Sequence, residues 1–94
     1  MVRIFKALSD RTRQDILELL VSDEMNVTDI CASFKTSQPT ISHHLQILKS
    51  CYLVDSRKDG KEIYYFVRED VVRDVFGAFF KKMRIDVVAK TDPM

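Results

Sequence analysis

Apolar residues recur along the first half of the chain at the three- and four-residue spacing of amphipathic helices. The spacing predicts a helix over residues 2–8, a second over residues 11–21 after the Ser9-Asp10 cap, and a third from about residue 27. The first helix is too short to be stable alone, so it should dock on a neighbour. The chain therefore begins as a set of short helices, each with one face directed to a core.

Residues 36–49 form a predicted helix with an unusual polar face. Its apolar positions follow the i, i+4, i+7 spacing at Ile41, Leu45 and Leu48. The opposite face carries short hydrogen-bonding groups where Glu and Lys would be usual, namely Thr40, Ser42, His43 and Gln46. Such side chains can approach the base edges of DNA closely. With the helix before it, this stretch predicts a helix-turn-helix over about residues 27–50, whose second helix reads DNA.

Beyond residue 52 the apolar period changes from 3.6 to 2, which indicates β-strands. Two β-rich runs flank Asp59-Gly60, and Asp-Gly between such runs favours a type I′ hairpin turn. Three basic residues lie near the predicted tip, namely Arg57, Lys58 and Lys61. A basic hairpin after a DNA-reading helix is the wing of a winged helix, here over about residues 53–67. Its tip can reach phosphates or the minor groove.

A last amphipathic helix is predicted over about residues 69–90, with two acidic residues at its positive dipole end. Its apolar face holds more aromatic surface than a terminal helix on so small a core needs. The interpretation we favour is a dimer interface shared with the first helix. The residues assigned to this interface are Val2, Phe5, Val72, Val75, Phe76, Phe79, Phe80 and Met83. A hydrophobic ligand pocket lined by Phe76, Phe79 and Phe80 is the alternative.

The composition is that of one small domain over residues 1–94. Hydrophobic residues make up 46% of the chain, which has only two Gly and two Pro, so we expect a mainly α fold of about five helices and a two-stranded hairpin. No apolar run is long enough to span a membrane, and neither a signal peptide nor a disulfide scaffold is indicated, so a cytoplasmic location is expected. No phosphate loop, nucleophile motif or carboxylate pair indicates an enzyme.

The net charge of +1 says little about nucleic acid, but its distribution is informative. Residues 35–68 carry six basic and three acidic side chains, whereas residues 1–34 carry four basic and six acidic ones. A phosphate-facing surface needs a local excess of this kind rather than a high overall charge. The positive charge therefore accumulates on the segment that holds the predicted reading helix and wing.

The candidate DNA contacts come from the reading helix and the wing, and they are Ser37, Gln38, Thr40, Ser42, His43, Gln46, Lys49, Arg57, Lys58 and Lys61. Gln38 and His43 are the expected base readers, because amide and imidazole groups pair with purine edges. The serines and threonine are expected to bond phosphates or cap the helix. The alternatives are a merely solvated helix face and a winged-helix module that binds protein. Such a module need not keep basic residues beside an uncharged polar face.

Three stretches, in this order, resemble the ArsR/SmtB family of winged-helix repressors, namely residues 5–13, 37–45 and 53–65. Arg11 stands where a proline is common in the family, and Tyr52 stands where glycine is usual and a positive φ would be strained. The resemblance implies a homodimer whose first and last helices pair and which binds an imperfect palindrome at a promoter. It also implies repression that a small signal relieves, often a metal ion.

The metal sites that the resemblance implies are not expected here. One is built from cysteines near the helix before the reading helix, where this chain keeps only Cys31. The other uses Asp, His and Glu on the terminal helix, but the chain has no histidine after residue 70. Since His43 and His44 diverge by about 100° on a helix, they cannot easily share an ion. We expect no metal and no other cofactor, and leave open an inducer and a disulfide between Cys31 and Cys51.

Overall fold

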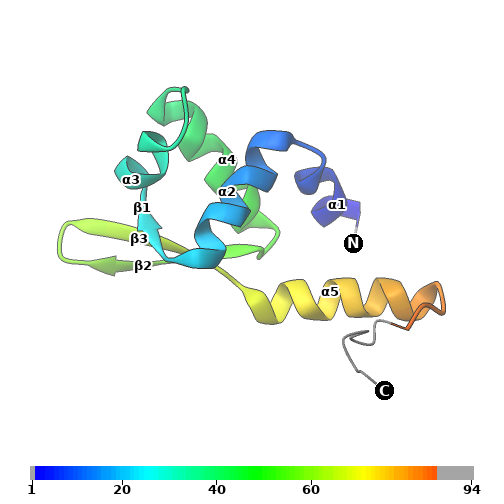
Figure 1. Cartoon of the computed structure of the whole chain (residues 1–94). Coiled ribbons are helices and arrows are strands. Elements are labelled where there is room, and N and C mark those ends of the chain that lie inside the picture. Colours follow the sequence, from blue (N-terminus) through cyan, green and yellow to red (C-terminus); the bar gives the residue numbers. More distant parts are fainter. Residues whose placement is uncertain (1, 87–94) are drawn as a thin grey trace, which may run out of the picture.

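A computed structural model of the chain describes residues 2–86. Over these residues the element order is α1 (Val2–Leu8), α2 (Arg11–Ser22), β1 (Met25–Asn26), α3 (Val27–Ala32), α4 (Gln38–Ser50), β2 (Val54–Asp59), β3 (Glu62–Val67) and α5 (Glu69–Lys82). Helices α2, α3 and α4 pack together, the β2–β3 hairpin extends from one side, and α5 runs along the opposite edge with α1 above its far half (Figure 1). This is the winged helix-turn-helix that the sequence predicts.

Short polar side chains cap three of the helices, and the first of these caps lies in the predicted Ser9-Asp10 pair. Asp10 caps α2 by accepting the Arg13 N–H at 3.1 Å. Asn26 caps α3, and its Oδ1 accepts the Asp29 N–H at 2.8 Å. Ser37 caps α4, with proline in the first turn of that helix. Each cap satisfies an N–H group that the helix itself cannot pair, so these helix starts are determined by local chemistry.

The apolar stripes of α2, α3 and α4 meet in one core. The fully buried side chains are Ile16, Ile30, Ile41, Leu45, Leu48, Leu53 and Val54. Burial of each such side chain contributes about 1.5–3 kcal/mol. Three of the seven belong to α4, so the core holds the inner face of α4 in one orientation and leaves its polar face outward. The reading helix is thus a rigid part of the domain.

The wing differs from the predicted two-stranded hairpin because a third strand joins it. Strand β1 pairs antiparallel with β3, Met25 opposite Tyr65 and Asn26 opposite Tyr64, and gives the sheet order β1-β3-β2. Asn26 Nδ2 also donates to Glu62 at 3.2 Å. A two-residue strand is too short to show the alternation by which strands are predicted.

The hairpin itself is confirmed, but the predicted type I′ turn at Asp59-Gly60 is wrong. Asp59 pairs with Glu62 as the last residue of β2, so the turn residues are Gly60 and Lys61. Only Gly60 has a positive φ, +64°, whereas a type I′ turn needs two such residues.

Helices α4 and α5 both end in a left-handed residue that is not glycine. Tyr52 follows α4 with a φ of +65°, and the Leu53 N–H reaches back to Leu48 O at 3.0 Å. Arg84 follows α5 with a φ of +59°, and the Ile85 N–H reaches Phe80 O at 2.9 Å. Both are Schellman caps, and each left-handed side chain costs about 1–2 kcal/mol. The usual cap is therefore kept at position 52 despite the tyrosine.

The cap at Arg84 also corrects the predicted length of the last helix. The prediction extended it to about residue 90, whereas α5 ends at Lys82. Apolar residues continue to Ile85, so the 3.6-residue pattern gave no signal of the end. The part of the predicted helix beyond residue 86 lies outside the described residues. Within residues 2–86, no helix is long and apolar enough to cross a membrane.

Candidate nucleic-acid interface

The outer face of α4 is exposed and uncharged over its first two turns. Gln38, Thr40, His43 and Gln46 are exposed, and Ser42 is half-buried. Ser37 Oγ accepts the Thr40 N–H at 3.4 Å and lies 2.9 Å from Thr40 Oγ1, so these two hydroxyls already serve the cap. Within the described residues, the side chains of Gln38, His43 and Gln46 make no hydrogen bond. Their donors and acceptors are therefore available to a ligand on this face.

The wing presents two lysines at its tip. Lys58 and Lys61 are exposed and form no ion pair with any of residues 2–86. Arg57 is different, because its guanidinium pairs with Glu24 and Asp59 and lies 5.1 Å from the centre of the Tyr64 ring. The hydrogen bond from Arg57 holds the pKa of Glu24 below its usual range. Two of the three predicted wing contacts are thus free cations, and the third is engaged within the domain.

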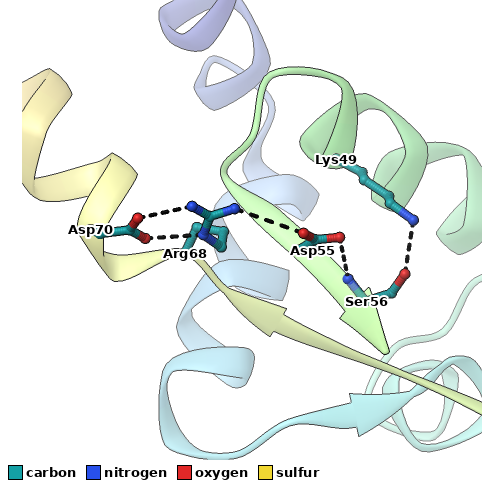
Figure 2. A network of polar contacts seen from close by, with 5 residues as sticks. All are labelled: Lys49, Asp55, Ser56, Arg68 and Asp70. Carbon is teal, nitrogen blue, oxygen red and sulfur yellow. Dashed lines mark hydrogen bonds and ion pairs between the residues drawn. The ribbon is translucent and has the colours of Figure 1, made fainter. Parts of the chain in front are cut away.

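Lys49, at the end of α4, is connected to the wing and to α5 through a polar network (Figure 2). Its Nζ donates to Ser56 Oγ at 2.8 Å, and the Ser56 N–H donates to Asp55 at 2.7 Å. Arg68 lies 3.7 Å from Asp55 and forms a two-pronged pair with Asp70, at 3.0 and 2.9 Å. The network therefore joins the reading helix, strand β2 and the start of α5.

Sequence reasoning missed Asp55, Arg68 and Asp70 as part of this region. Asp55 and Arg68 are brought together by a strand register that places Val54 opposite Val67, which is set by the hairpin and not by a local motif. Nothing in the sequence indicated that Arg68 pairs with Asp70 at the start of α5, beyond the acidic residues at that helix start. The missed residues are positioning groups, since they lie behind Lys49 and not on the exposed face of α4.

The carboxyl group of Asp70 is expected to titrate far below its ordinary value. The hydrogen bonds from Arg68 lower the pKa of Asp70 from 3.8 to about 2. Because the folded-state pKa is depressed, the pair stabilises the fold above about pH 4 and loses this effect as the pH falls toward 2. Carbon-detected NMR titration should give the low midpoint in the wild type and a clearly higher midpoint in Arg68→Gln. An unchanged midpoint in Arg68→Gln would contradict the pairing.

The two histidines and the two cysteines lie in different settings. His44 is half-buried, with its Nδ1 3.3 Å from Arg13 Nη1. Cys51 is buried, and its thiol donates to Ile47 O and Leu48 O. Cys31 is half-buried, and both cysteines are free thiols. Within residues 2–86, no disulfide links the two sulfur atoms.

The apolar face of α5 packs on α1 and remains partly uncovered. The Phe5 ring lies edge-on to Phe76 and Phe79, with centroids 5.8 and 5.0 Å apart. Within the described part of the chain, no residue of α5 is fully buried, and Val2 of α1 is 82% exposed. The first and last helices therefore meet within one chain, and Phe5, Phe76, Phe79 and Phe80 form a half-buried aromatic surface there. The assignment of this surface to a dimer interface stays a prediction.

Comparison with known proteins decides the family. Residues 10–56, which span α2, α3, α4 and the start of β2, match the model of the arsR family of bacterial regulatory proteins. The chain belongs to the arsR family. The Transcriptional repressor SdpR of Bacillus subtilis is 43% identical to it over 74 residues, covering 79% of this chain and 82% of SdpR. ArsR-family membership makes the protein a transcriptional regulator with a winged helix-turn-helix DNA-binding domain.

Solved structures of ArsR-type regulators share the fold. The ArsR-like transcriptional regulator from Rhodococcus sp. RHA1 superposes with a TM-score of 0.83 at 29% identity, covering 88% of this chain and 76% of that one. The winged helix-turn-helix domain Mb0332 of Mycobacterium bovis gives a TM-score of 0.72 at 33% identity, covering 90% and 81% of the two chains. That domain is homodimeric, and it is a possible ArsR-family transcriptional regulator.

We expect that stoichiometric zinc, cadmium or arsenite does not release the protein from DNA. Residues 2–86 contain no group of three or more His, Cys, Asp or Glu side chains placed to hold a metal ion. A tight site for these ions needs three or four such ligands. Fluorescence anisotropy of a labelled duplex measures release directly. Release by one equivalent of metal, reversed by a chelator, would contradict the prediction.

Proposed function

We propose that this ArsR-family protein is a homodimeric repressor that binds an imperfect palindrome in a promoter. The observation that carries the proposal is the exposed, uncharged polar face of α4, together with exposed lysines at the end of α4 (Lys49) and in the wing (Lys58 and Lys61). Base edges are read by short hydrogen-bonding side chains, whereas phosphates are bound by cations. The reading helix and the wing together supply both kinds of contact.

Each group has a role in this proposal that follows from its bonding within the domain. Gln38, His43 and Gln46 enter the major groove with unpaired donors and acceptors and contact base edges. Ser37 and Thr40 hold the start of α4, whose N–H groups face a phosphate. The wing lysines reach the backbone beside the site read by α4. Lys49 contacts phosphate from the far end of α4, oriented by Ser56.

The partner in the homodimer is a second copy bound through α1 and the aromatic face of α5. A two-fold axis through this interface presents two copies of α4 in successive major grooves, about 34 Å apart. The homodimeric Mycobacterium bovis domain supports such an assembly in the family. Two identical half-sites then follow from the symmetry of the protein, which is why a palindrome is proposed.

The affinity for duplex DNA is expected to fall steeply as the salt concentration rises, because bound lysines release counterions. Replacing Lys58 and Lys61 by Gln should reduce the slope of log affinity against log salt by about one for each phosphate that is no longer neutralised. The reduction should be the same for every duplex sequence, since phosphates carry no sequence information. The Lys81→Gln/Lys82→Gln double variant is the matched control, because it removes the same two charges from exposed positions of α5. A slope unchanged in the Lys58/Lys61 variant would contradict the role of the wing.

A further inference from the structure

A cavity of about 300 Å³ lies between α1, α2 and the last turns of α4, where Ile47 and Ser50 help to line it. Its charged lining residues are Arg3 and Lys6 from α1 and Arg13 from α2. Its floor includes Ala7 and Ile47, and the buried thiol of Cys51 adjoins it. The proposed function uses none of its three cations.

All charged residues that line this cavity are positive. Within residues 2–86, none of Arg3, Lys6 and Arg13 forms an ion pair with a carboxylate. Helices α1 and α4 both end nearby, and each helix C-terminus contributes about half a negative charge. Three full positive charges exceed these partial charges, so the cavity attracts anions.

The guanidinium of Arg13 is held in place before any ligand arrives. Its Nε donates to Ala7 O at 2.7 Å, and its Nη1 lies 3.3 Å from His44 Nδ1. A cation fixed in this way loses little conformational entropy on binding. Arg3 and Lys6 lie on exposed positions of α1 at the mouth of the cavity, where their side chains can move to contact a bound anion. The site thus combines one fixed cation with two adaptable ones.

The cations and the floor together define the chemistry of the ligand. We infer that the cavity is a binding site for a small organic anion, with its anionic group at Arg3, Lys6 and Arg13 and its apolar body on Ala7 and Ile47. A bare phosphate of DNA would use the cations but not the apolar floor. A carboxylate on a compact hydrocarbon or aromatic body uses both.

The cavity and the aromatic surface of α1 occupy different faces of that helix. Arg3, Lys6 and Ala7 follow the i, i+3, i+4 spacing of one face, whereas Phe5 points to α5. Dimerisation through Phe5 and α5 therefore leaves the cavity open. Because Ile47 and Ser50 line the cavity and the Arg13–His44 contact adjoins it, a bound anion would touch the last turns of the reading helix.

Benzoate and benzamide form a matched pair of probes, since they share an apolar body and differ in charge. Amide NMR titration of the ¹⁵N-labelled dimer should show benzoate shifting Ala7, Ile47 and Ser50, with an affinity roughly tenfold above that of benzamide. The Arg3→Gln/Lys6→Gln double variant should lower the benzoate affinity toward that of benzamide, with Arg13 as the remaining cation, and leave benzamide binding unchanged. Both positions are exposed, so the core is not altered. Arg11→Gln, an exposed cation outside the cavity, is the control.

The inference is overturned if benzoate shifts none of these amides, binds no better than benzamide, or keeps its affinity in the double variant. It is also overturned if the double variant lowers the salt slope of duplex binding, because the cations would then be phosphate contacts. The benzoate titration contains no DNA. A negative benzoate result therefore does not contradict the proposed repressor function. In the same way, a protein that binds no DNA would not contradict the anion site.

Discussion

The Phe79→Asp protein is expected to be a monomer that has lost measurable affinity for its operator. Phe79 lies at the centre of the aromatic surface, 5.0 Å from the Phe5 ring. In a two-fold interface the substitution occurs twice, so it removes two aromatic side chains and places two unpaired carboxylates in an apolar environment. A monomer holds one half-site at a time, so operator affinity should fall by roughly 100-fold or more.

Light scattering and a duplex titration measure the two effects of Phe79→Asp. Since no described residue of α5 is fully buried, the core of α2, α3 and α4 should remain folded, which circular dichroism checks. Ala78→Asp is the matched control, because it places the same carboxylate on the adjacent, exposed position of α5. That protein should stay dimeric and bind DNA. An intact Phe79→Asp dimer would remove α5 from the interface.

Gln38→Ala and His43→Ala are expected to relax the sequence preference of the protein. Both side chains are exposed, and neither makes a hydrogen bond within the described residues. Truncation should therefore cost little stability and remove a direct interaction with a base. Each truncation should reduce discrimination at the affected base pair by about 1–3 kcal/mol, and symmetry places the effect in both half-sites.

The Gln38 and His43 effects are distinguished from a general decrease in affinity by comparison across operator variants. Duplexes changed at one base pair per half-site should bind the wild type unequally and the matching Ala variant more nearly equally. Lys61→Gln should instead weaken all of these duplexes alike, because it removes a cation that binds phosphate. An Ala variant that keeps the full wild-type preference would show that its side chain does not read a base.

The predictable parts of this fold are those set by neighbouring residues. The caps at Asp10, Asn26 and Ser37 are formed by side chains that bond an N–H three residues onward, so they can be recognised in the sequence. The hairpin and its glycine could be recognised in the same way, but the turn type could not, since Asp59 ends β2 and only Gly60 has a positive φ. The exposed polar face of α4 was predictable for a similar reason, because the 3.6-residue period of its apolar positions determines which side chains face outward.

The parts that were missed depend on contacts between distant segments. Strand β1 forms only because Met25 and Asn26 meet the free edge of β3, about forty residues later. The pairing of Arg68 with Asp55 depends on the register of the hairpin. The end of α5 depends on a left-handed Arg84, a residue without the glycine signal that usually marks such a cap. Local patterns do not reveal any of the three.

Selection from a pool of random duplexes tests the central claim most directly. Purified protein is incubated with the pool at moderate salt, and the bound duplexes are sequenced over several rounds. The proposed homodimer predicts one enriched motif with two inverted half-sites whose centres are about 10 base pairs apart. A pool in which no motif is enriched, although the protein is folded and dimeric, would contradict the claim that this face of α4 reads DNA sequence.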